Sequence, residues 1–160
     1  MARFAWLFGA LLLGLLAAEL TPPVQRVLVQ PWTGLVASGS AMLIRTFDPQ
    51  VVAVANMLQS TRNGFAVSIQ AGCNGIEATI VLVSAMVAFP ASWKHRLAGI
   101  AIGFAAVQAL NVVRVVSLFY LGQWSTPAFE WAHLYLWQAL IMLDVLAVTL
   151  VWMRLSPRPE

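Results

Sequence analysis

Cys73 is the only cysteine of this 160-residue chain, and it lies in the segment Ala71-Gly72-Cys73-Asn74-Gly75-Ile76-Glu77, just before a long apolar run. A lone thiol cannot form an internal disulfide, and it lacks the CxxC partner of a metal or redox site. Cys73 is therefore either a small inert hydrophobic residue or a nucleophile. The adjacent glycines and Asn74 predict a tight, exposed turn at the start of a helix, where backbone N–H groups and the helix dipole would favour a thiolate.

Arg114 is a charged residue inside an apolar stretch of spanning length. Placing such a charge in a membrane costs at least about 2.5 kcal/mol on insertion scales, so the residue is a functional candidate by default. Gln108, Asn111 and Ser117 recur with it every three residues, which predicts a polar, broadly inward-facing stripe on a helix. The alternatives are that Arg114 snorkels outward or pairs with Asp144 to hold the helices together.

His133 directly precedes the last apolar run. A cysteine, an arginine and a histidine together could perform acyl transfer. The thiolate attacks a carbonyl, histidine moves protons, and arginine lowers the thiol pKa and neutralises the oxyanion. The alternative for His133 is an interfacial residue in an aromatic belt with Trp131, Tyr135 and Trp137.

Two acidic residues could support this chemistry. Glu77 follows Cys73 by four residues, so it could orient the arginine or the histidine, or it could be a first-turn acid that complements the helix dipole. Asp144 lies near the middle of the last apolar run. It could belong to a proton or ion path, or it could form a structural bridge to Asn111 or Arg114.

The composition is that of an integral membrane protein, because 61% of the residues are hydrophobic and only 9% are charged. Mean hydropathy is +0.82. The net charge of +3 comes from scattered basic residues without an aromatic-interleaved patch, so we expect no nucleic-acid partner. We also expect no metal and no cofactor. The sequence predicts a single integral membrane domain over residues 1–160.

Apolar segments near the length of about 20 residues that a spanning helix needs occur four times. They cover residues 4–20, 76–92, 97–121 and 134–153. The first is interpreted as an uncleaved anchor, because no small-x-small cleavage site follows it. Both termini are predicted to lie inside by the positive-inside rule, because basic residues flank the spans on that side. These residues are Arg3, those of the loop 94–96, Arg154 and Arg158. The cysteine, the arginine and the histidine then meet at the outer face.

Residues 21–75 are predicted to be external. We expect residues 27–44 to form an amphipathic helix on the outer surface or against the bundle, because a fifth span would place Cys73 inside and contradict the charge pattern. Residues 51–58 and 65–69 flank Asn63-Gly64, a strong hairpin signal. The predicted fold is therefore all-α and polytopic, with about four spanning helices, an external amphipathic helix and a short β-hairpin before Cys73.

The ordered set of the Cys73 turn, Asn111-Val112-Val113-Arg114 and the late His133 resembles the exosortase/archaeosortase family, over residues 71 to 133. The short chain is similar to the compact exosortase H type. The resemblance implies a membrane cysteine transpeptidase with Cys73 as nucleophile, Arg114 as proton donor or oxyanion partner, and His133 assisting the transition state. The absence of the additional helices of larger relatives leaves fewer surfaces to bind the substrate helix.

The resemblance also implies the substrates and the location. These would be exported proteins with a C-terminal motif, a transmembrane helix and a basic tail, transferred to an acceptor nucleophile that the sequence does not identify. The location would be the bacterial inner membrane, among its lipids. The competing interpretations are a non-enzymatic transporter or assembly subunit that uses an Arg114–Asp144 pair, and a redox protein that needs a partner thiol in trans.

Overall fold

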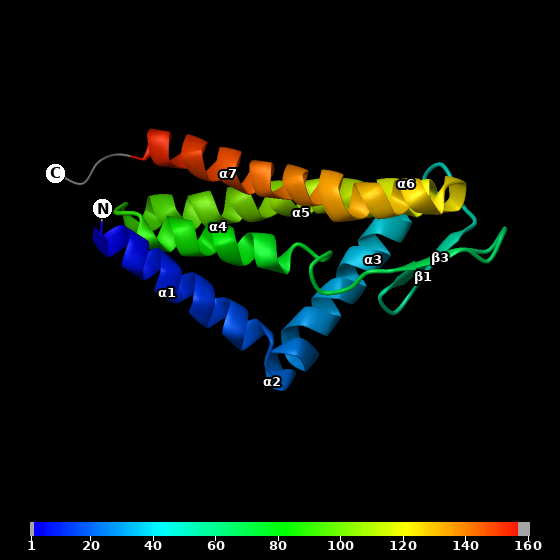
Figure 1. Cartoon of the computed structure of the whole chain (residues 1–160), viewed down its shortest axis with the longest axis horizontal. Helices are drawn as coiled ribbons and strands as arrows, with labels where there is room; N and C mark the ends of the chain where they lie inside the picture. The colour runs from blue at the N-terminus through cyan, green and yellow to red at the C-terminus, as the bar shows by residue number, and fades with distance from the viewer. Residues whose placement is uncertain (1, 157–160) are drawn as a thin grey trace.

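The computed structural model describes residues 2–156; Arg158, used above to predict orientation, lies outside them. The predicted all-α membrane fold with a small β element is confirmed (Figure 1). The elements in order are α1 (Ala2–Glu19), α2 (Pro22–Val24), η1 (Gln25–Val29), α3 (Gln30–Arg45), β1 (Val51–Val54), β2 (Met57–Ser60), β3 (Ala66–Ser68), α4 (Ile76–Ala88), α5 (Trp93–Trp124), α6 (Thr126–Trp131), η2 (Ala132–Leu136) and α7 (Trp137–Leu155). Here η1 and η2 are π-helical turns.

Helices α4, α5 and α7 form the central bundle and run side by side (Figure 1). Pro90 follows the end of α4, and the Ser92 hydroxyl accepts a hydrogen bond from the backbone N–H of His95 to begin α5. Gly103 allows close packing, since a Cβ there would lie 2.8 Å from a methyl carbon of Leu82. The bundle buries Ala78, Leu82, Met86, Val107, Ile141, Val145 and Trp152.

Helices α1 and α3 diverge from α2 like the arms of a V (Figure 1). The chain reverses at Thr21, whose extended backbone (φ −73°, ψ 141°) is the conformation favoured before proline, and Pro22 begins α2. Helix α1 packs on α4, whereas α3 packs on α5 and on β1. The loop that carries Cys73 precedes α4 and therefore lies close to both α1 and α3.

The three strands form an antiparallel sheet in the order β1-β2-β3, which differs from the predicted hairpin. The predicted turn at Asn63-Gly64 does connect β2 to β3, but the run 51–58 is two strands rather than one. The chain turns at Ala55, which has a φ of 53°, and Asn56 stabilises that turn by donating from its side-chain amide to the carbonyl oxygen of Ile69. The sequence Ala-Asn carries a weaker turn signal than Asn-Gly, and it was missed for that reason.

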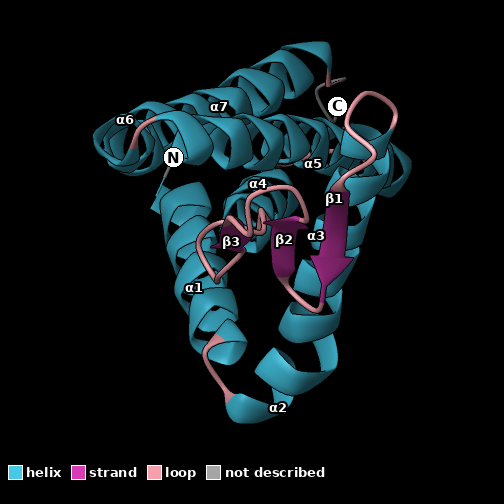
Figure 2. Cartoon of the chain, turned by 90° about the vertical axis from the view of Figure 1, so that its right-hand side faces the viewer, coloured by secondary structure: helices cyan, strands magenta, loops and turns pink. Residues whose placement is uncertain are grey.

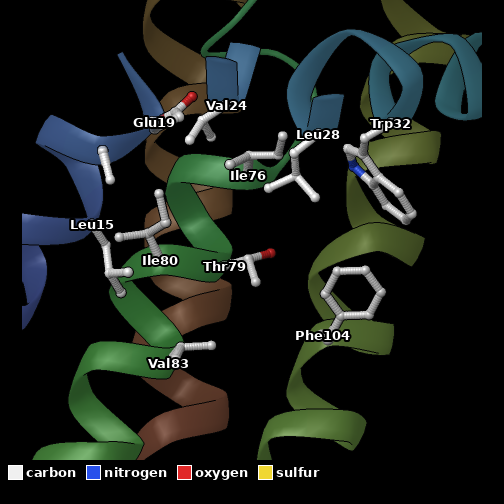
Figure 3. Close-up of a pocket in the computed structure, with 11 residues that line it drawn as sticks. Leu15, Glu19, Val24, Leu28, Trp32, Ile76, Thr79, Ile80, Val83 and Phe104 are labelled. Atoms are coloured by element: carbon white, nitrogen blue, oxygen red, sulfur yellow. The ribbon is translucent and has the colours of Figure 1, made fainter. Parts of the chain in front are cut away.

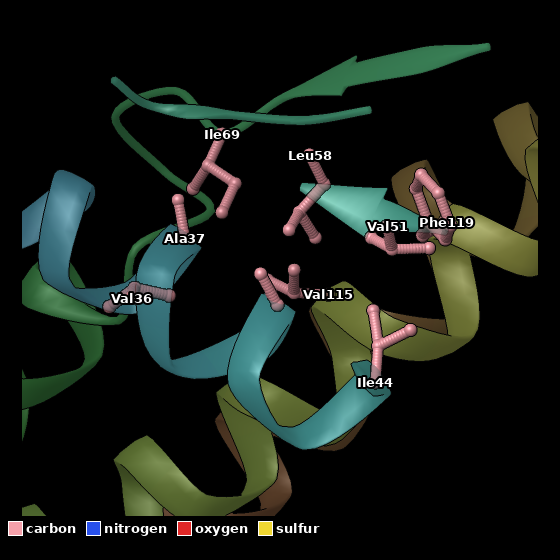
Figure 4. Packing of buried hydrophobic residues seen from close by; sticks show 9 residues of the cluster. Val36, Ala37, Ile44, Val51, Leu58, Ile69, Val115 and Phe119 are labelled. Carbon is pink, nitrogen blue, oxygen red and sulfur yellow. The ribbon is translucent and has the colours of Figure 1, made fainter. Parts of the chain in front are cut away.

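The sheet is fixed to α3 and α5 by one hydrophobic cluster (Figure 4). Its buried members are Val36, Ala37, Ala41, Ile44, Val51, Leu58, Ile69, Val115 and Phe119. Figure 2 views the molecule from the sheet side and shows β1 in front of α3. Cys73 packs against this same cluster, so the sheet helps to position the loop that carries the thiol.

Helical segments long and apolar enough to cross a membrane are residues 22–45, 93–124 and 126–155, judged by length and composition. Helix α4 is a shorter apolar helix, with 13 residues. The four predicted spans stay predictions, and so does the external position of residues 27–44. These spans cover residues 4–20, 76–92, 97–121 and 134–153. The chain is thus a membrane protein in which segment 22–45 has the composition of a span.

Candidate functional site: a cysteine, an arginine and a histidine at the end of the bundle

The loop between β3 and α4 holds Cys73 in a partly buried position. The sequence predicted an exposed turn. This prediction is wrong for Cys73 and the two residues after it, because Cys73 is half-buried and Asn74 and Gly75 are buried. Trp32 of α3 covers the loop and donates from its indole N–H to the carbonyl oxygen of Asn74 at 3.1 Å. No local pattern in the sequence predicts this long-range contact.

Gly75 ends the loop in a left-handed conformation, with a φ of 78°, as the residue before α4. Any other side chain there would also meet Gln108 of α5, whose amide nitrogen would lie 2.7 Å from the added Cβ. Gln108 donates from that amide to the carbonyl oxygen of Gly75 at 3.3 Å. Position 75 therefore requires glycine, because its backbone is left-handed and because a side chain would collide with Gln108.

Asn74 organises the same loop from the inside. Its side-chain oxygen accepts from the backbone N–H of Ile76 at 3.0 Å, and its amide donates to the hydroxyl of Thr33 at 3.0 Å. These bonds tie the start of α4 to α3. The Asn74 side chain thus contacts the backbone at the start of α4 and the side chain of Thr33 rather than the thiol, and its supporting role stays a prediction.

Arg114 of α5 lies beside the thiol and is 3% exposed. Its Nη2 donates to Sγ of Cys73 at 3.4 Å, and its Nη1 donates to the carbonyl oxygen of Gly72 at 3.2 Å. The guanidinium therefore faces inward to the loop rather than snorkelling outward. Its Nε is buried without a hydrogen-bond partner among the described residues.

His133 lies in the π-helical turn η2 and also approaches the thiol. Both ring nitrogens lie 3.9 Å from Sγ of Cys73, so neither one points directly at the sulfur. The imidazole stacks on Phe129, one helical turn earlier, with ring centroids 5.7 Å apart and planes 2° from parallel. Phe129 was not singled out by the sequence analysis, although its spacing of four residues from His133 places it on the same helix face.

A small cavity of about 40 Å³ lies where the three side chains meet. Val67, Ile69, Leu118 and Phe129 supply its apolar wall, together with Cys73, Arg114 and His133. This is close to the volume of one water molecule, so the space suits a single oxygen-sized group rather than a side chain. The apolar wall strengthens the electrostatic effect of Arg114 on any charge that forms there.

The environment of the thiol has two opposing effects on its pKa. Burial raises the pKa of Cys73 and is the larger effect, the Arg114 guanidinium lowers it, and the nearby Glu77 carboxylate raises it again. The net direction is upward. The prediction that the turn favours a resting thiolate is therefore wrong, because desolvation outweighs the guanidinium. A raised thiol pKa favours the protonated form of Cys73, which needs a base when it reacts.

Glu77 does not orient Arg114 or His133, which was one of the two roles considered for it. Its carboxylate instead accepts a hydrogen bond from the backbone N–H of Gly72. Helix α1, which packs on α4, ends at Glu19, a second acidic residue that is 5% exposed. Glu19 was not identified from the sequence, because it ends an apolar run and looks like an ordinary boundary charge.

Asn111 and Asp144 do not join the site. Asn111 is fully buried one turn from Arg114, yet both atoms of its amide lack hydrogen-bond partners within the part of the chain that is described. Oδ2 of Asp144 is likewise unpartnered within residues 2–156. The nitrogens of Arg114 bind Gly72 and Cys73 instead. The proposed bridges from Asp144 to Arg114 or Asn111 are therefore not formed.

The comparisons with known proteins identify a family. A family model described as transmembrane exosortase (Exosortase_EpsH) matches residues 2–154. No curated protein and no solved structure matches the chain. The matched range includes the Cys73 loop, α5 and η2, and thus all three residues around the cavity. The chain belongs to the transmembrane exosortase family.

Proposed function

We propose that this protein is a membrane cysteine transpeptidase with Cys73 as nucleophile, Arg114 as oxyanion stabiliser and His133 as proton-transfer residue. The observation that carries the proposal is that Sγ of Cys73 lies 3.4 Å from Arg114 and 3.9 Å from both nitrogens of His133. The substrates would be exported proteins with a C-terminal motif, a transmembrane helix and a basic tail. The site would face the outside of the bacterial inner membrane.

The first half of the reaction forms an acyl-thioester. His133 removes the proton from the Cys73 thiol, and the sulfur attacks the carbonyl carbon of the scissile peptide bond. A carbon–sulfur bond forms, and the carbonyl oxygen becomes an oxyanion that accepts hydrogen bonds from Arg114. When the carbon–nitrogen bond breaks, the imidazolium of His133 returns its proton to the leaving amine. The C-terminal helix and basic tail are released with that amine.

The second half transfers the acyl group. An acceptor nucleophile on the cell surface loses its proton to His133 and attacks the thioester carbon, and the carbon–sulfur bond breaks. The imidazolium of His133 then returns that proton to the sulfur, which regenerates the thiol. Arg114 keeps its proton throughout, because a guanidinium is not deprotonated at accessible pH. This chemistry favours oxyanion stabilisation over proton donation as the role of Arg114.

The test is co-expression with a candidate exported protein that carries a C-terminal apolar helix and a basic tail. We expect a size reduction of the substrate that Cys73→Ala and Cys73→Ser abolish, while both variants insert in the membrane at the wild-type level. Added hydroxylamine should release a trapped wild-type acyl-enzyme. Unchanged processing by Cys73→Ala would overturn the proposal in favour of a non-enzymatic membrane subunit.

A further inference from the structure

Strand β3 is an edge strand, because the strands of the sheet are ordered β1-β2-β3. Figure 2 shows β3 at the side of the sheet opposite to β1 and α3. Its residues Ala66 and Ser68 are exposed, whereas Val67 between them is partly buried against the hydrophobic cluster of the sheet. An edge strand presents backbone N–H and C=O groups with which another extended chain can pair.

The hydrogen bonds on either side of β3 determine which of its backbone groups are free. The C=O of Phe65 accepts from β2 at 2.9 Å, and the N–H of Ile69 donates to the residue just before β2 at 2.8 Å. Backbone groups of an antiparallel strand alternate between facing a neighbour and facing away from it. Val67 therefore faces β2, and the N–H and C=O groups of Ala66 and Ser68 face the open side. No turn or loop hydrogen bond between backbone groups of residues 2–156 uses them.

A cavity of about 280 Å³ runs along this open edge, and we call it the β3 groove. Four consecutive residues, 65–68, line it from the sheet, and Gly122, Thr126 and Phe129 line it from α5 and α6. Consecutive residues of a strand point to opposite faces, so a cavity that touches all four follows the edge of the strand. The β3 groove therefore has the position that an added strand would occupy.

The β3 groove adjoins the small cavity at the thiol. Val67, Ser68 and Phe129 line both spaces, and Cys73 lines the second. A chain that pairs with β3 and continues past Ser68 thus arrives at the nucleophile. By contrast, the cavity of about 490 Å³ between α1, α3, α4 and α5 (Figure 3) shares no lining residue with the thiol cavity.

We propose that the β3 groove binds the extended substrate segment on the N-terminal side of the scissile bond, as a fourth strand paired with β3. The inference rests on the proposed function, because it assigns the binding mode of the substrate at that same site. The N–H groups of Ala66 and Ser68 donate to carbonyl oxygens of the substrate, and their C=O groups accept from its amides. The backbone pairing provides affinity, and the wall formed by Phe129 contacts the substrate side chains.

The direction of the bound segment follows from the depth of the site along α5. Phe65 and Gly122 line the β3 groove together, whereas Ile69 lines the thiol cavity with Arg114. Arg114 precedes Gly122 by eight residues, so it lies about 12 Å farther from the end of α5. The proposed substrate enters the lipid with its C-terminal helix, so its chain passes from the end of α5 to the thiol. Strand β3 runs the same way, and the substrate strand is therefore parallel to it.

Disulfide cross-linking tests this binding mode without catalysis. In a Cys73→Ser background, Ala66→Cys and Ser68→Cys each place one thiol at an exposed position of β3. The probe is the co-expressed exported protein of the processing test, with single cysteines at successive positions before its apolar helix. We expect cross-links at every second position. The position that reacts with Ala66→Cys should lie N-terminal to the position that reacts with Ser68→Cys. Val54→Cys, exposed at the end of β1, is the control and should form no cross-link.

A pair of proline variants tests the backbone hydrogen bonds. Ala66→Pro removes an N–H that faces the β3 groove and leaves the ladder to β2 in place. Ala53→Pro is the matched control on the other edge of the sheet. Its N–H also faces away from β2, because Val51, two residues earlier, accepts there from the side chain of Arg45 at 2.9 Å. At equal membrane levels, Ala66→Pro should process substrate about 2-fold to 10-fold more slowly than Ala53→Pro, the effect of one lost backbone hydrogen bond.

The outcomes distinguish this inference from the proposed function. Missing cross-links, or cross-links without the two-residue period, would overturn the pairing with β3, and a reversed order of positions would overturn the parallel direction. Equal processing by Ala66→Pro and Ala53→Pro would overturn the role of the free N–H. The expected cross-links together with an inactive wild type would support the β3 groove as a binding site and overturn the transpeptidase function.

Discussion

Nη2 of Arg114 lies 3.4 Å from Sγ of Cys73, and the guanidinium lowers a thiol pKa that burial raises. Replacing Arg114 by alanine should therefore move the alkylation curve of Cys73 to higher pH. The rate at a fixed pH below the midpoint should fall about tenfold for each unit of that shift. Arg62→Ala is the matched control, because Arg62 is an exposed arginine in the turn after β2. An alkylation curve that Arg114→Ala does not move would contradict this coupling.

Arg114→Lys separates charge from geometry. Lysine keeps a positive charge but not the fork that donates to both Gly72 and Cys73. We expect the alkylation curve to stay near that of the wild type, while substrate processing falls by about 100-fold or more, the usual cost of losing an oxyanion donor. Full processing by Arg114→Lys would show that charge alone is sufficient.

His133→Ala should lower substrate processing by about 100-fold to 10,000-fold, the range typical of a lost general acid–base residue. The control is His95→Gln. His95 lies in the first turn of α5, whereas Arg114 lies in the second half of that helix, and the ring of His95 stacks on Trp152. Phe129→Leu should give a smaller loss, because it removes the ring that stacks on the imidazole but keeps the histidine. Comparable losses from His95→Gln and His133→Ala would point to general destabilisation.

Gly75→Ala should destabilise the loop and lower the yield of folded protein. The left-handed backbone costs about 1–2 kcal/mol for a residue with a Cβ, and the new methyl group would displace Gln108. A shift to lower temperature in thermal unfolding measures the effect. Gly39→Ala in α3 is the control, because a Cβ there meets nothing within 4 Å. Equal unfolding temperatures for the two variants would contradict the role assigned to Gly75.

The orientation can be tested with single reporter cysteines in a Cys73→Ser background. Arg62→Cys lies in the exposed turn between β2 and β3, and Lys94→Cys lies in the exposed first turn of α5. A membrane-impermeant thiol reagent added to intact cells should label the first and not the second. The opposite result would place the cysteine site on the inner face and reverse the proposed topology.

The sequence predicted the helical membrane architecture because long apolar runs indicate that lipid rather than water surrounds the helices. It also predicted that Cys73, Arg114 and His133 lie on one face, and in the structure they surround one cavity. Their catalytic roles stay predictions.

The details that the sequence missed depend on contacts between distant segments. Trp32 binds the loop from 42 residues away, and α1 packs on α4 although the whole predicted external segment separates them in the sequence. The split of the first strand depends on Asn56, whose amide binds Ile69 thirteen residues later. The resting state of the thiol was misjudged for the same reason, since its burial arises from tertiary packing that local turn residues do not encode.

Helix α5 is longer than the hydrocarbon core of a bilayer is thick. Its 32 residues span about 48 Å, which exceeds the hydrocarbon thickness of about 30 Å. Lys94 and Arg114 are separated by twenty residues, or about 30 Å of helix, so the two cationic side chains lie about one hydrocarbon thickness apart along α5. The proposed transpeptidase, with its thiol beside Arg114 near one end of this span, predicts that bilayer thickness affects which peptide bond of a substrate helix the thiol reaches.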